Sequence, residues 1–259
     1  MAPRVFLITG TSTGFGEELV KVVLQKGDHV VATARNSSKL SFQGANDSNS
    51  LLVDLDVTEK DSIDKAFHAA INKFKRVDVV LRQQMEINFF GLIDVTRKAM
   101  ETMRDLKIGG VIQNVTSIGG QIGVPSFSIY CTSKWAVEGF TEAISKEVKP
   151  EWGIKFTCIE PGDFRTDWSG RSMAFGEISH PAYDHINAKE NAQKRNGTQA
   201  GDPAKAAKVF YDLAVMDDPL MRCVVGTDAY SLINQKLDTY GQSVKKFEKW
   251  SNSTDAKGY

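Results

Sequence analysis

The fold of this chain is decided by one stretch near its start, Val5-Phe6-Leu7-Ile8-Thr9-Gly10-Thr11-Ser12-Thr13-Gly14-Phe15-Gly16. Its first part, Val5 to Thr9, is a continuous apolar run that ends at a glycine, which is typical of a strand buried on both faces of a parallel sheet. Apolar residues then recur at helical spacing from Glu17 until Gly27, a helix stop signal. The stretch therefore predicts a strand, a glycine-rich turn and a helix.

The glycine-rich turn is a candidate phosphate site. Glycine tolerates positive φ and lets the backbone approach a pyrophosphate, while the helix N-terminus behind the turn offers free N–H groups and the positive end of a dipole. An ordinary glycine-rich turn is the alternative interpretation. A Walker loop is disfavoured because no Gly-Lys-Ser/Thr follows. The candidate cofactor-binding residues here are Gly10, Thr11, Ser12, Thr13, Gly14, Phe15 and Gly16.

Strand and helix patterns alternate along the rest of the chain. After the first strand, apolar runs predict strands over 29–34, 51–55, 78–81, 110–116, 154–159 and 223–225. Between them, helical patterns cover 85–103 and 128–148, Thr58 and Asp61 form a capping-box pattern for another helix, and Asp202-Pro203 opens a later one. This alternation predicts an α/β fold, a doubly wound parallel sheet in one domain, residues 1–259.

The composition excludes several classes of protein. The 259 residues carry 32 Lys and Arg against 32 Asp and Glu, so nothing in the charge favours nucleic acid or an anionic membrane. The three cysteines are too few and scattered for a disulfide framework, and no CxxC pair suggests zinc. No apolar run is long enough for a signal peptide or a membrane span. We expect a cytoplasmic protein with no nucleic-acid or membrane partner.

The end of the second predicted strand bears on the cofactor. Arg35 stands where the adenosine ribose of a dinucleotide would lie, and an arginine there pairs with a 2′-phosphate that an acidic residue would repel. This favours NADP(H) over NAD(H), although a solvated surface arginine has the same sequence signature. Asp56 is a candidate acceptor for the adenine amino group, Asp54 is the competing choice, and either could simply cap a turn.

Three residues predict acid/base chemistry. Tyr130 and Lys134 lie four apart on one face of a predicted helix, and Ser117 follows the fifth strand, at the sheet edge where ligands of α/β proteins bind. A lysine ammonium and an oxidised nicotinamide stabilise a tyrosine phenolate and make it usable near neutral pH. Asp163 and Asp167 invite a metal site, but nothing nearby has convincing ligand spacing, so we expect no metal.

Together these motifs resemble one family. Thr9–Gly16, Asn88–Gly91, Ser117, the pair Tyr130 and Lys134, and Pro161–Thr166, in this order, resemble the classical short-chain dehydrogenase/reductase family, in particular its NADP-preferring, carbonyl-reductase-like and 17β-hydroxysteroid-dehydrogenase-like members. The resemblance implies a Rossmann-like sheet of about seven strands with helices on both faces. It also implies a homodimer or homotetramer, and hydride transfer between NADP(H) and a small carbonyl or secondary alcohol.

The resemblance assigns roles as well. It implies that Tyr130 is the general acid/base, that Ser117 polarises the carbonyl, and that Lys134 binds the nicotinamide ribose and lowers the tyrosine pKa. It implies that Asn88 holds a water linking Lys134 to solvent. The remaining cofactor contacts that it implies are Pro161, Gly162, Phe164 and Thr166, the last to the carboxamide. The resemblance makes residues 168–200 a substrate lid, in which Trp168, Met173, Phe175 and Tyr183 favour an apolar substrate. We expect residues 245–259 to be a frayed polar tail.

The sequence departs from the family pattern at one place. The family's Asn-Asn-Ala-Gly motif, loop and short helix are missing between about Val80 and Arg82, a shortfall on the order of twenty residues. Either the sequence omits a stretch of the protein, which we favour because the catalytic residues are intact, or a true deletion removes one wall of the cofactor site. A true deletion makes a catalytically silent NADP-binding scaffold or sensor the alternative function.

Overall fold

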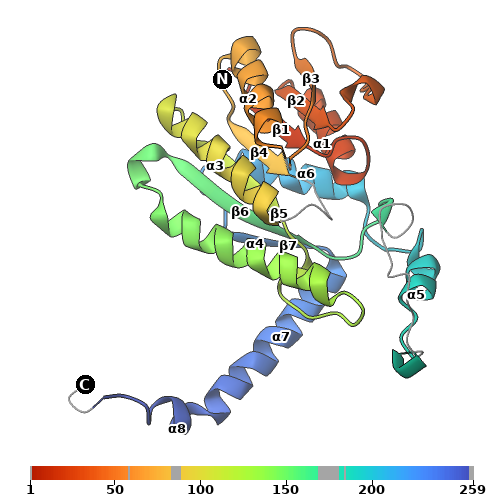
Figure 1. Ribbon diagram of the computed structural model, residues 1–259, viewed down its shortest axis with the longest axis vertical. Coiled ribbons are helices and arrows are strands. Elements are labelled where there is room, and N and C mark those ends of the chain that lie inside the picture. The colour runs from red at the N-terminus through yellow and green to blue at the C-terminus, as the bar shows by residue number, and fades with distance from the viewer. Residues whose placement is uncertain (1, 58, 83–88, 169–180, 184, 257–259) are drawn as a thin grey trace.

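The computed structural model describes residues 2–57, 59–82, 89–168, 181–183 and 185–256 (Figure 1). In these residues seven parallel strands form one sheet in the order β3-β2-β1-β4-β5-β6-β7, which confirms the predicted doubly wound fold. The strands are β1 (Val5–Thr9), β2 (His29–Ala34), β3 (Ser50–Asp54), β4 (Val79–Arg82), β5 (Gly110–Val115), β6 (Ile154–Pro161) and β7 (Arg222–Val225).

The strand order reverses beside β1. The chain moves outward from β1 to β2 and β3, and then returns to pair β4 with the other side of β1, where Phe6 faces Val79. The connections on the two sides of this point leave the sheet in opposite directions, so a crevice opens at the carboxyl ends of the strands. The glycine-rich turn follows β1 directly and therefore lies in this crevice.

Helices cover both faces of the sheet. One face packs against α1 (Gly14–Gln25) and α6 (Pro203–Ala214), the other against α2 (Lys60–Phe74), α3 (Phe89–Asp105) and α4 (Ser128–Glu147) (Figure 1). Side chains of a strand alternate between faces, so Phe6 and Ile8 join the first cluster, and Val5 and Leu7 the second. All four side chains are buried. Burial on both faces is the reason that β1 reads as an unbroken apolar run.

Local signals at helix ends were predicted with mixed success. Gly27 ends α1 with a φ of 79°, and the Asp202 carboxylate caps α6 by accepting the Ala204 N–H at 2.9 Å, as predicted. The N-cap of α2 is Glu59 rather than the expected Thr58, which itself lies outside the described residues. The expected helix over 85–103 starts at Phe89 within the described part of the chain.

The place of the expected missing segment is bounded by two regular elements. β4 ends at Arg82, is paired with both β1 and β5, and α3 begins at Phe89. The connection itself, residues 83–88, lies outside the described residues. Strand pairing on both sides of β4 means that the shortfall does not remove a strand.

The C-terminal region differs most from expectation. The 20-residue α7 (Thr227–Lys246) follows β7 and projects beyond the sheet, and α8 (Glu248–Ser251) follows it (Figure 1). The expected frayed tail from Lys245 is therefore corrected, since part of it is helical.

The described part of the expected lid contains α5 (Ala188–Arg195) and a single 3-10 turn, Pro181–Tyr183. None of the helices in the described ranges is long and apolar enough to cross a membrane.

Candidate active site

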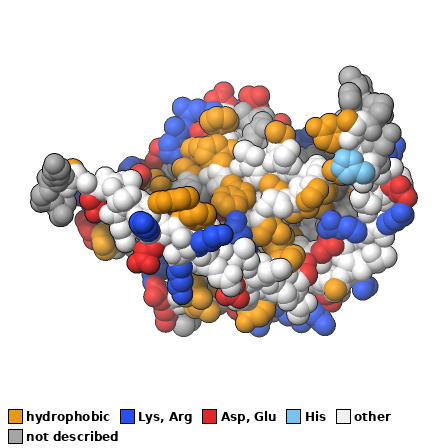
Figure 2. Space-filling model, turned by 90° about the horizontal axis from the view of Figure 1, so that it is seen from below, with side chains coloured by type: hydrophobic (Ala, Val, Ile, Leu, Met, Phe, Trp, Pro, Cys, Tyr) orange, Lys and Arg blue, Asp and Glu red, His pale blue; other side chains and the backbone are white. Residues whose placement is uncertain are grey.

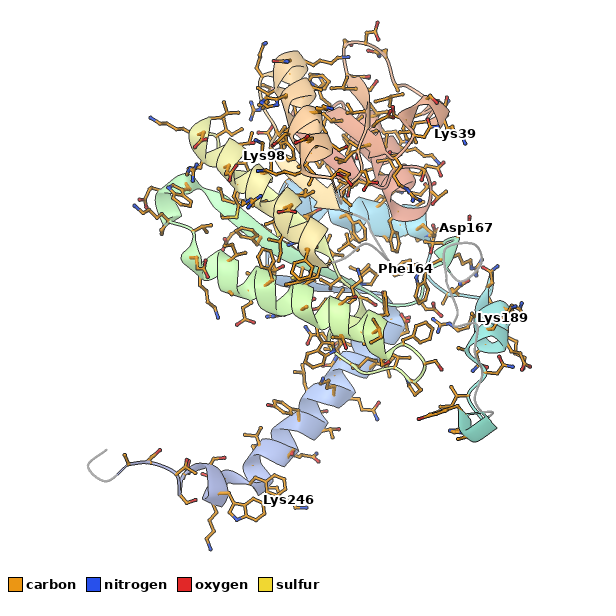
Figure 3. The ribbon with its side chains drawn as sticks, viewed as in Figure 1. Lys39, Lys98, Phe164, Asp167, Lys189 and Lys246 are labelled. Carbon is orange, nitrogen blue, oxygen red and sulfur yellow. The ribbon has the colours of Figure 1, made fainter. Side chains whose placement is uncertain are left out.

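A cavity of about 560 Å³ occupies the crevice at the carboxyl ends of the strands. It is lined by the turn after β1 and the start of α1, by the residue after β2, and by residues of β5, α4, the loop after β6 and the start of α7. Most of the predicted site residues line it together, namely Gly10, Ser12, Thr13, Gly14, Phe15, Arg35, Ser117, Tyr130, Lys134, Pro161, Gly162, Phe164 and Thr166. Figure 3 shows two residues of this cavity, Phe164 and Asp167, on the segment between the sheet and α5.

The glycine-rich turn has the geometry that the sequence predicts. Gly10 and Gly14 have φ angles of 69° and 65°, which a side chain at either position would strain. α1 begins at Gly14, and its N-cap residue, Thr13, makes no side-chain cap hydrogen bond. A Cβ on Gly14 would also lie 3.5 Å from the Thr166 side chain across the cavity. The turn is thus a close backbone surface at a helix N-terminus, suited to an anionic ligand.

Some predicted cofactor residues do not line the cavity. Thr11 is buried, and its hydroxyl donates to the Thr33 carbonyl at 3.1 Å, so it ties the turn to β2. Gly16 is buried within α1. Asn88 lies outside the described residues. The sequence alone does not show whether Thr11 or Ser12 lines the cavity, because this depends on the backbone conformation of the turn.

The two candidate adenine-binding carboxylates also lie apart from the cavity lining. The Asp54 carboxylate accepts the Ser37 N–H at 2.6 Å, a bond that lowers its pKa and holds the 3-10 turn Ser37–Lys39 after β2. The Asp56 N–H donates to Ser62 Oγ at 2.9 Å near the start of α2. The Asp54 carboxylate thus makes a turn contact of the kind that the alternative interpretation describes, and the adenine contact expected for Asp56 stays a prediction.

Ser117 and Tyr130 are brought together by a short turn after β5. Ser117 is the N-cap of the 3-10 turn Ile118–Gly120, and its Oγ accepts the Gly119 N–H at 3.0 Å. A Cβ on Gly119 would lie 3.2 Å from the Tyr130 ring, so glycine leaves room for the tyrosine. The Ser117 and Tyr130 side chains hydrogen-bond to each other.

Burial sets the protonation of Tyr130. Burial raises the pKa of Tyr130 to about 12, and the hydrogen bond with Ser117 opposes part of that rise. The rings of Phe127 and Trp168 lie 6.3 and 5.4 Å from the Tyr130 ring and contribute to this apolar setting. In the protein alone burial determines the pKa of Tyr130, and the lowering that the resemblance implies for Lys134 with an oxidised nicotinamide stays a prediction.

Lys134 is buried one turn beyond Tyr130 on α4. Its Nζ donates to the Val115 carbonyl at 3.1 Å and lies 5.8 Å from the centroid of the Tyr130 ring. The 5.8 Å distance runs to the ring centroid and does not establish a hydrogen bond between Nζ and the Tyr130 hydroxyl. The ammonium faces the cavity beside Tyr130, where it can donate to a ligand hydroxyl.

The comparison with known proteins agrees with this geometry. The family model for short chain dehydrogenases matches residues 4–174, about two thirds of the chain. The chain belongs to the short-chain dehydrogenase family. An uncharacterized oxidoreductase of Schizosaccharomyces pombe is 32% identical, with 92% of this chain and 87% of that protein covered. A short-chain dehydrogenase from Streptomyces avermitilis has a solved structure with a TM-score of 0.85 at 30% identity, covering 98% of this chain and all of that one.

A third relative is longer than this chain over the aligned region. The oxidoreductase BOA17 of Botryotinia fuckeliana is 32% identical, with 96% of this chain and 98% of that protein covered. The alignment runs over 270 positions, which is more than the 259 residues of this chain. This relative therefore has residues that have no counterpart in this chain.

Sequence reasoning missed Asp228 in this short-chain dehydrogenase. Asp228 lies in the first turn of α7, lines the cavity, and accepts the Asp163 N–H at 2.7 Å. A Cβ on Gly162 would lie 2.3 Å from its carboxylate, so glycine at 162 lets Asp228 hold the loop after β6. The available signal was Gly226-Thr227-Asp228, an acidic residue directly after the last strand at the same sheet edge.

A second missed feature is an ion pair at the cavity wall. Arg195, the last residue of α5, donates to both carboxylate oxygens of Asp163, at 2.7 and 3.1 Å. This two-point pair fastens α5 to the loop after β6. Asp163, considered above as a metal ligand, thus has a partner. In the described part of the chain no group of three His, Cys, Asp or Glu side chains is placed to hold a metal.

A buried carboxyl pair lies behind the site. Glu138 and Glu160 are almost fully buried, Arg222 pairs with Glu138 at 3.0 Å, and Gln121 donates to Glu160 at 2.9 Å. Burial and the neighbouring Glu138 raise the pKa of Glu160 to about 7. Because Glu138 also accepts the Thr116 hydroxyl, the pair lies directly beneath the segment that carries Ser117.

Proposed function

We propose that this short-chain dehydrogenase is an NADP(H)-dependent oxidoreductase that interconverts a small carbonyl compound and a secondary alcohol. The observation that carries the proposal is the placement of Ser117, Tyr130 and Lys134 in the same cavity as the glycine-rich turn and Arg35. One end of that cavity suits phosphates and the other suits acid/base chemistry. The free cysteines, of which Cys131 and Cys158 are buried and Cys223 is half-buried, support a cytoplasmic location.

The cavity residues fit a dinucleotide. The positive φ angles of Gly10 and Gly14 leave backbone N–H groups at the N-terminus of α1 for the pyrophosphate. Pro161, Gly162, Thr166 and Lys134, which line the same cavity, would hold the nicotinamide end. When bound, the cofactor supplies or accepts the hydride.

Arg35 supports NADP(H) over NAD(H). It is exposed at the end of β2 and lines the cavity, and no ion pair ties it to another of the described residues. A free guanidinium at this position can form a two-point contact with a ribose 2′-phosphate. In NAD(H), which lacks that phosphate, the same contact is lost.

The neutral Tyr130 suits reduction of a carbonyl. With a pKa of about 12 its hydroxyl carries the proton near neutral pH, so it can donate that proton to the carbonyl oxygen as the alcohol forms. Ser117 hydrogen-bonds to Tyr130 and can donate to the same oxygen, which polarises the carbonyl. In the reverse direction the phenolate forms only if positive charge from Lys134 and an oxidised nicotinamide offsets the burial.

The wall of the cavity supports an apolar substrate. Trp168 packs 5.6 Å from Phe127 and 5.4 Å from Tyr130, ring centroid to ring centroid, so aromatic surface borders the acid/base hydroxyl. Tyr183, at the lid, is 65% exposed, whereas Met173 and Phe175 lie outside the described residues. Residues 168–200 remain the proposed substrate lid, and Asn88 remains a proposed member of the proton path.

One experiment separates this proposal from the scaffold alternative. NADPH and NADH are titrated into the protein by fluorescence, and a panel of aldehydes and ketones is then screened for cofactor oxidation. We expect NADPH to bind more tightly than NADH and at least one apolar carbonyl to be reduced. Binding of NADPH without turnover of any carbonyl or alcohol would support the silent scaffold, which a true deletion near residues 80–82 would produce.

A further inference from the structure

The feature that the proposed function leaves unexplained is α7. This helix is 20 residues long, about 30 Å, and it projects away from the sheet (Figure 1). Of its described residues, Ala229 alone is classed as buried. Most of the stability of helices in proteins comes from packing of an apolar face, and Gly241 in the interior of α7 costs the helix about 1 kcal/mol relative to alanine. The part of the chain that the structure describes therefore supplies no partner for most of this helix.

The apolar residues of α7 and its end follow a heptad pattern. They recur at alternating intervals of three and four, which places them at the a and d positions of Tyr230, Ile233, Leu237, Tyr240, Val244 and Phe247. The exposed fractions of the side chains are 66% for Tyr230, 63% for Leu237 and 66% for Tyr240. We refer to these six residues as the α7 seam.

The seam is narrow and carries no charge. Asp238, Lys245 and Lys246 lie on the flanks at other heptad positions. Apart from Ala229 and Leu232 near the start of the helix, the larger apolar side chains of α7 lie at a and d, which is the pattern of a helix that packs against another helix. A broad apolar face suits a globular core or a membrane surface instead. Hydrophobic side chains interspersed with Lys and Arg are visible on the face of the molecule seen from below (Figure 2).

The body of the protein contacts a different face of α7. Ala229 and Lys236 share one heptad position beside the seam, and the Lys236 Nζ lies 4.1 Å from the centroid of the Trp135 ring on α4. Lys236 also donates to the Gln121 carbonyl. These contacts fix the first half of α7, whereas four seam residues, Tyr230, Leu237, Tyr240 and Val244, are more than half exposed.

We propose that the α7 seam pairs antiparallel with α7 of a second copy of this chain. In that orientation Tyr230 meets Phe247, Ile233 meets Val244 and Leu237 meets Tyr240, so the seam is its own complement across a two-fold axis. Self-complementarity of this kind is what an isologous interface requires.

Charge determines the antiparallel direction. The first turn of α7 contains Asp228, and its last turn contains Lys245 and Lys246, with Lys249 following in α8. A parallel pair would bring the two lysine clusters side by side, whereas an antiparallel pair keeps them at opposite ends of the pair. The antiparallel pair also opposes the two helix dipoles, so positive ends lie beside negative ends.

The area available is sufficient for a specific pair. Three aromatic and three aliphatic side chains from each copy, with about half of each covered, remove on the order of 1,000 Å² in total from water. Trp135, 45% exposed on α4 beside Lys236, can extend the contact. Because Asp228 and Leu232 of α7 line the cavity, the pair would also place the second copy near its rim.

Sedimentation velocity on the full chain between about 1 and 100 μM tests the pair. We expect the wild type to sediment as an even multiple of the chain mass, and the variant Leu237→Glu/Tyr240→Glu to sediment at half the wild-type mass. The control Gln235→Glu/Gln242→Glu adds the same charge on the opposite face of α7 and should keep the wild-type mass. Circular dichroism checks that each variant is folded.

Cysteine cross-linking tests the direction of the pair. Chains carrying Tyr230→Cys are mixed with differently tagged chains carrying Phe247→Cys and oxidised, and the disulfide should join one chain of each kind. A disulfide that joins two Tyr230→Cys chains would overturn the antiparallel arrangement.

Two results would overturn the proposal itself. One is a wild type that is monomeric at every concentration, and the other is a seam variant with the wild-type mass. If in addition a monomeric wild type floats with phosphatidylcholine/phosphatidylserine vesicles and the seam variant does not, a membrane surface rather than a second copy covers the seam.

Discussion

At the scale of single residues, Arg35 determines the cofactor preference that we propose. Removing its guanidinium removes a charge-assisted contact to a 2′-phosphate, which at this exposed position is worth about 1.5–3 kcal/mol in total. We expect Arg35→Ala to weaken NADPH binding by roughly 10- to 100-fold and to leave NADH binding within about twofold. Arg35→Lys, which keeps the charge but not the fork, should fall between them. Equal losses for NADPH and NADH in a fluorescence titration would contradict the role of Arg35.

Glu160 makes stability depend on pH. Its pKa is raised to about 7 in the folded protein, so between its ordinary value near 4.5 and about 7 the folded state holds a proton that the unfolded state has lost. The stabilisation is present at low pH and is lost as pH rises through about 7, with a slope of at most about 1.4 kcal/mol per pH unit.

The matched variant for this prediction is Glu160→Gln, which stays neutral at every pH. Urea unfolding between pH 5 and 8 should give a falling free energy of unfolding for the wild type and a flatter profile for the variant. Parallel profiles for the two proteins would show that Glu160 does not titrate in this range.

At the scale of elements, the contact between α5 and the loop after β6 should control access to the cavity. Arg195→Ala breaks the two-point pair with Asp163, and because the pair is partly exposed we expect a stability loss of less than about 1 kcal/mol. Looser positioning of α5 should raise the KM of an apolar carbonyl about threefold to tenfold with a smaller change in kcat. Steady-state kinetics measures both constants.

The control for Arg195→Ala lies next to it on α5. Lys194 pairs with Glu190 on the same helix, one turn away, and does not line the cavity. Lys194→Ala should therefore leave KM unchanged. If both variants raise KM alike, helix stability rather than the contact with Asp163 is responsible.

A second prediction at this scale concerns the junction between β4 and α3 and is tested by the mass of the intact protein. The relative with a 270-position alignment has residues that this 259-residue chain lacks, and β4 is nevertheless paired on both sides. We expect the intact protein purified from its source to be about 2 kDa heavier than 28.6 kDa, the mass of on the order of twenty residues between Val80 and Arg82. A measured mass of 28.6 kDa would establish a true deletion.

At the scale of the whole molecule, the sheet could be predicted because burial on both faces leaves unbroken apolar runs such as Val5 to Thr9. The cofactor turn and the pair Tyr130 and Lys134 could be predicted because they are local in sequence. Asp228 could not, since its contact with Asp163 joins segments 65 residues apart. The raised pKa of Tyr130 also escaped prediction, because it depends on the packing of Phe127 and Trp168 around the ring.

The helical end of the molecule escaped prediction for a different reason. The α7 seam is a narrow apolar stripe in an otherwise polar segment, and Gly241 interrupts it, so local propensity is weak. The a and d spacing of the seam is explained only by a second helix packed against it, as in the pair that we propose. The heptad spacing was present in the sequence but pointed to a partner rather than to the core.

The proposed function requires that the cavity is a catalytic site and that Tyr130 is its acid/base. The most direct test is the steady-state rate of NADPH oxidation with a carbonyl substrate for the wild type, for Tyr130→Phe and for Tyr211→Phe. The last variant removes a hydroxyl that donates to Asp28 outside the cavity. We predict that Tyr130→Phe lowers kcat about 100- to 10,000-fold with nearly unchanged NADPH binding, while Tyr211→Phe keeps the wild-type kcat. A kcat for Tyr130→Phe within a few-fold of the wild type would contradict the claim.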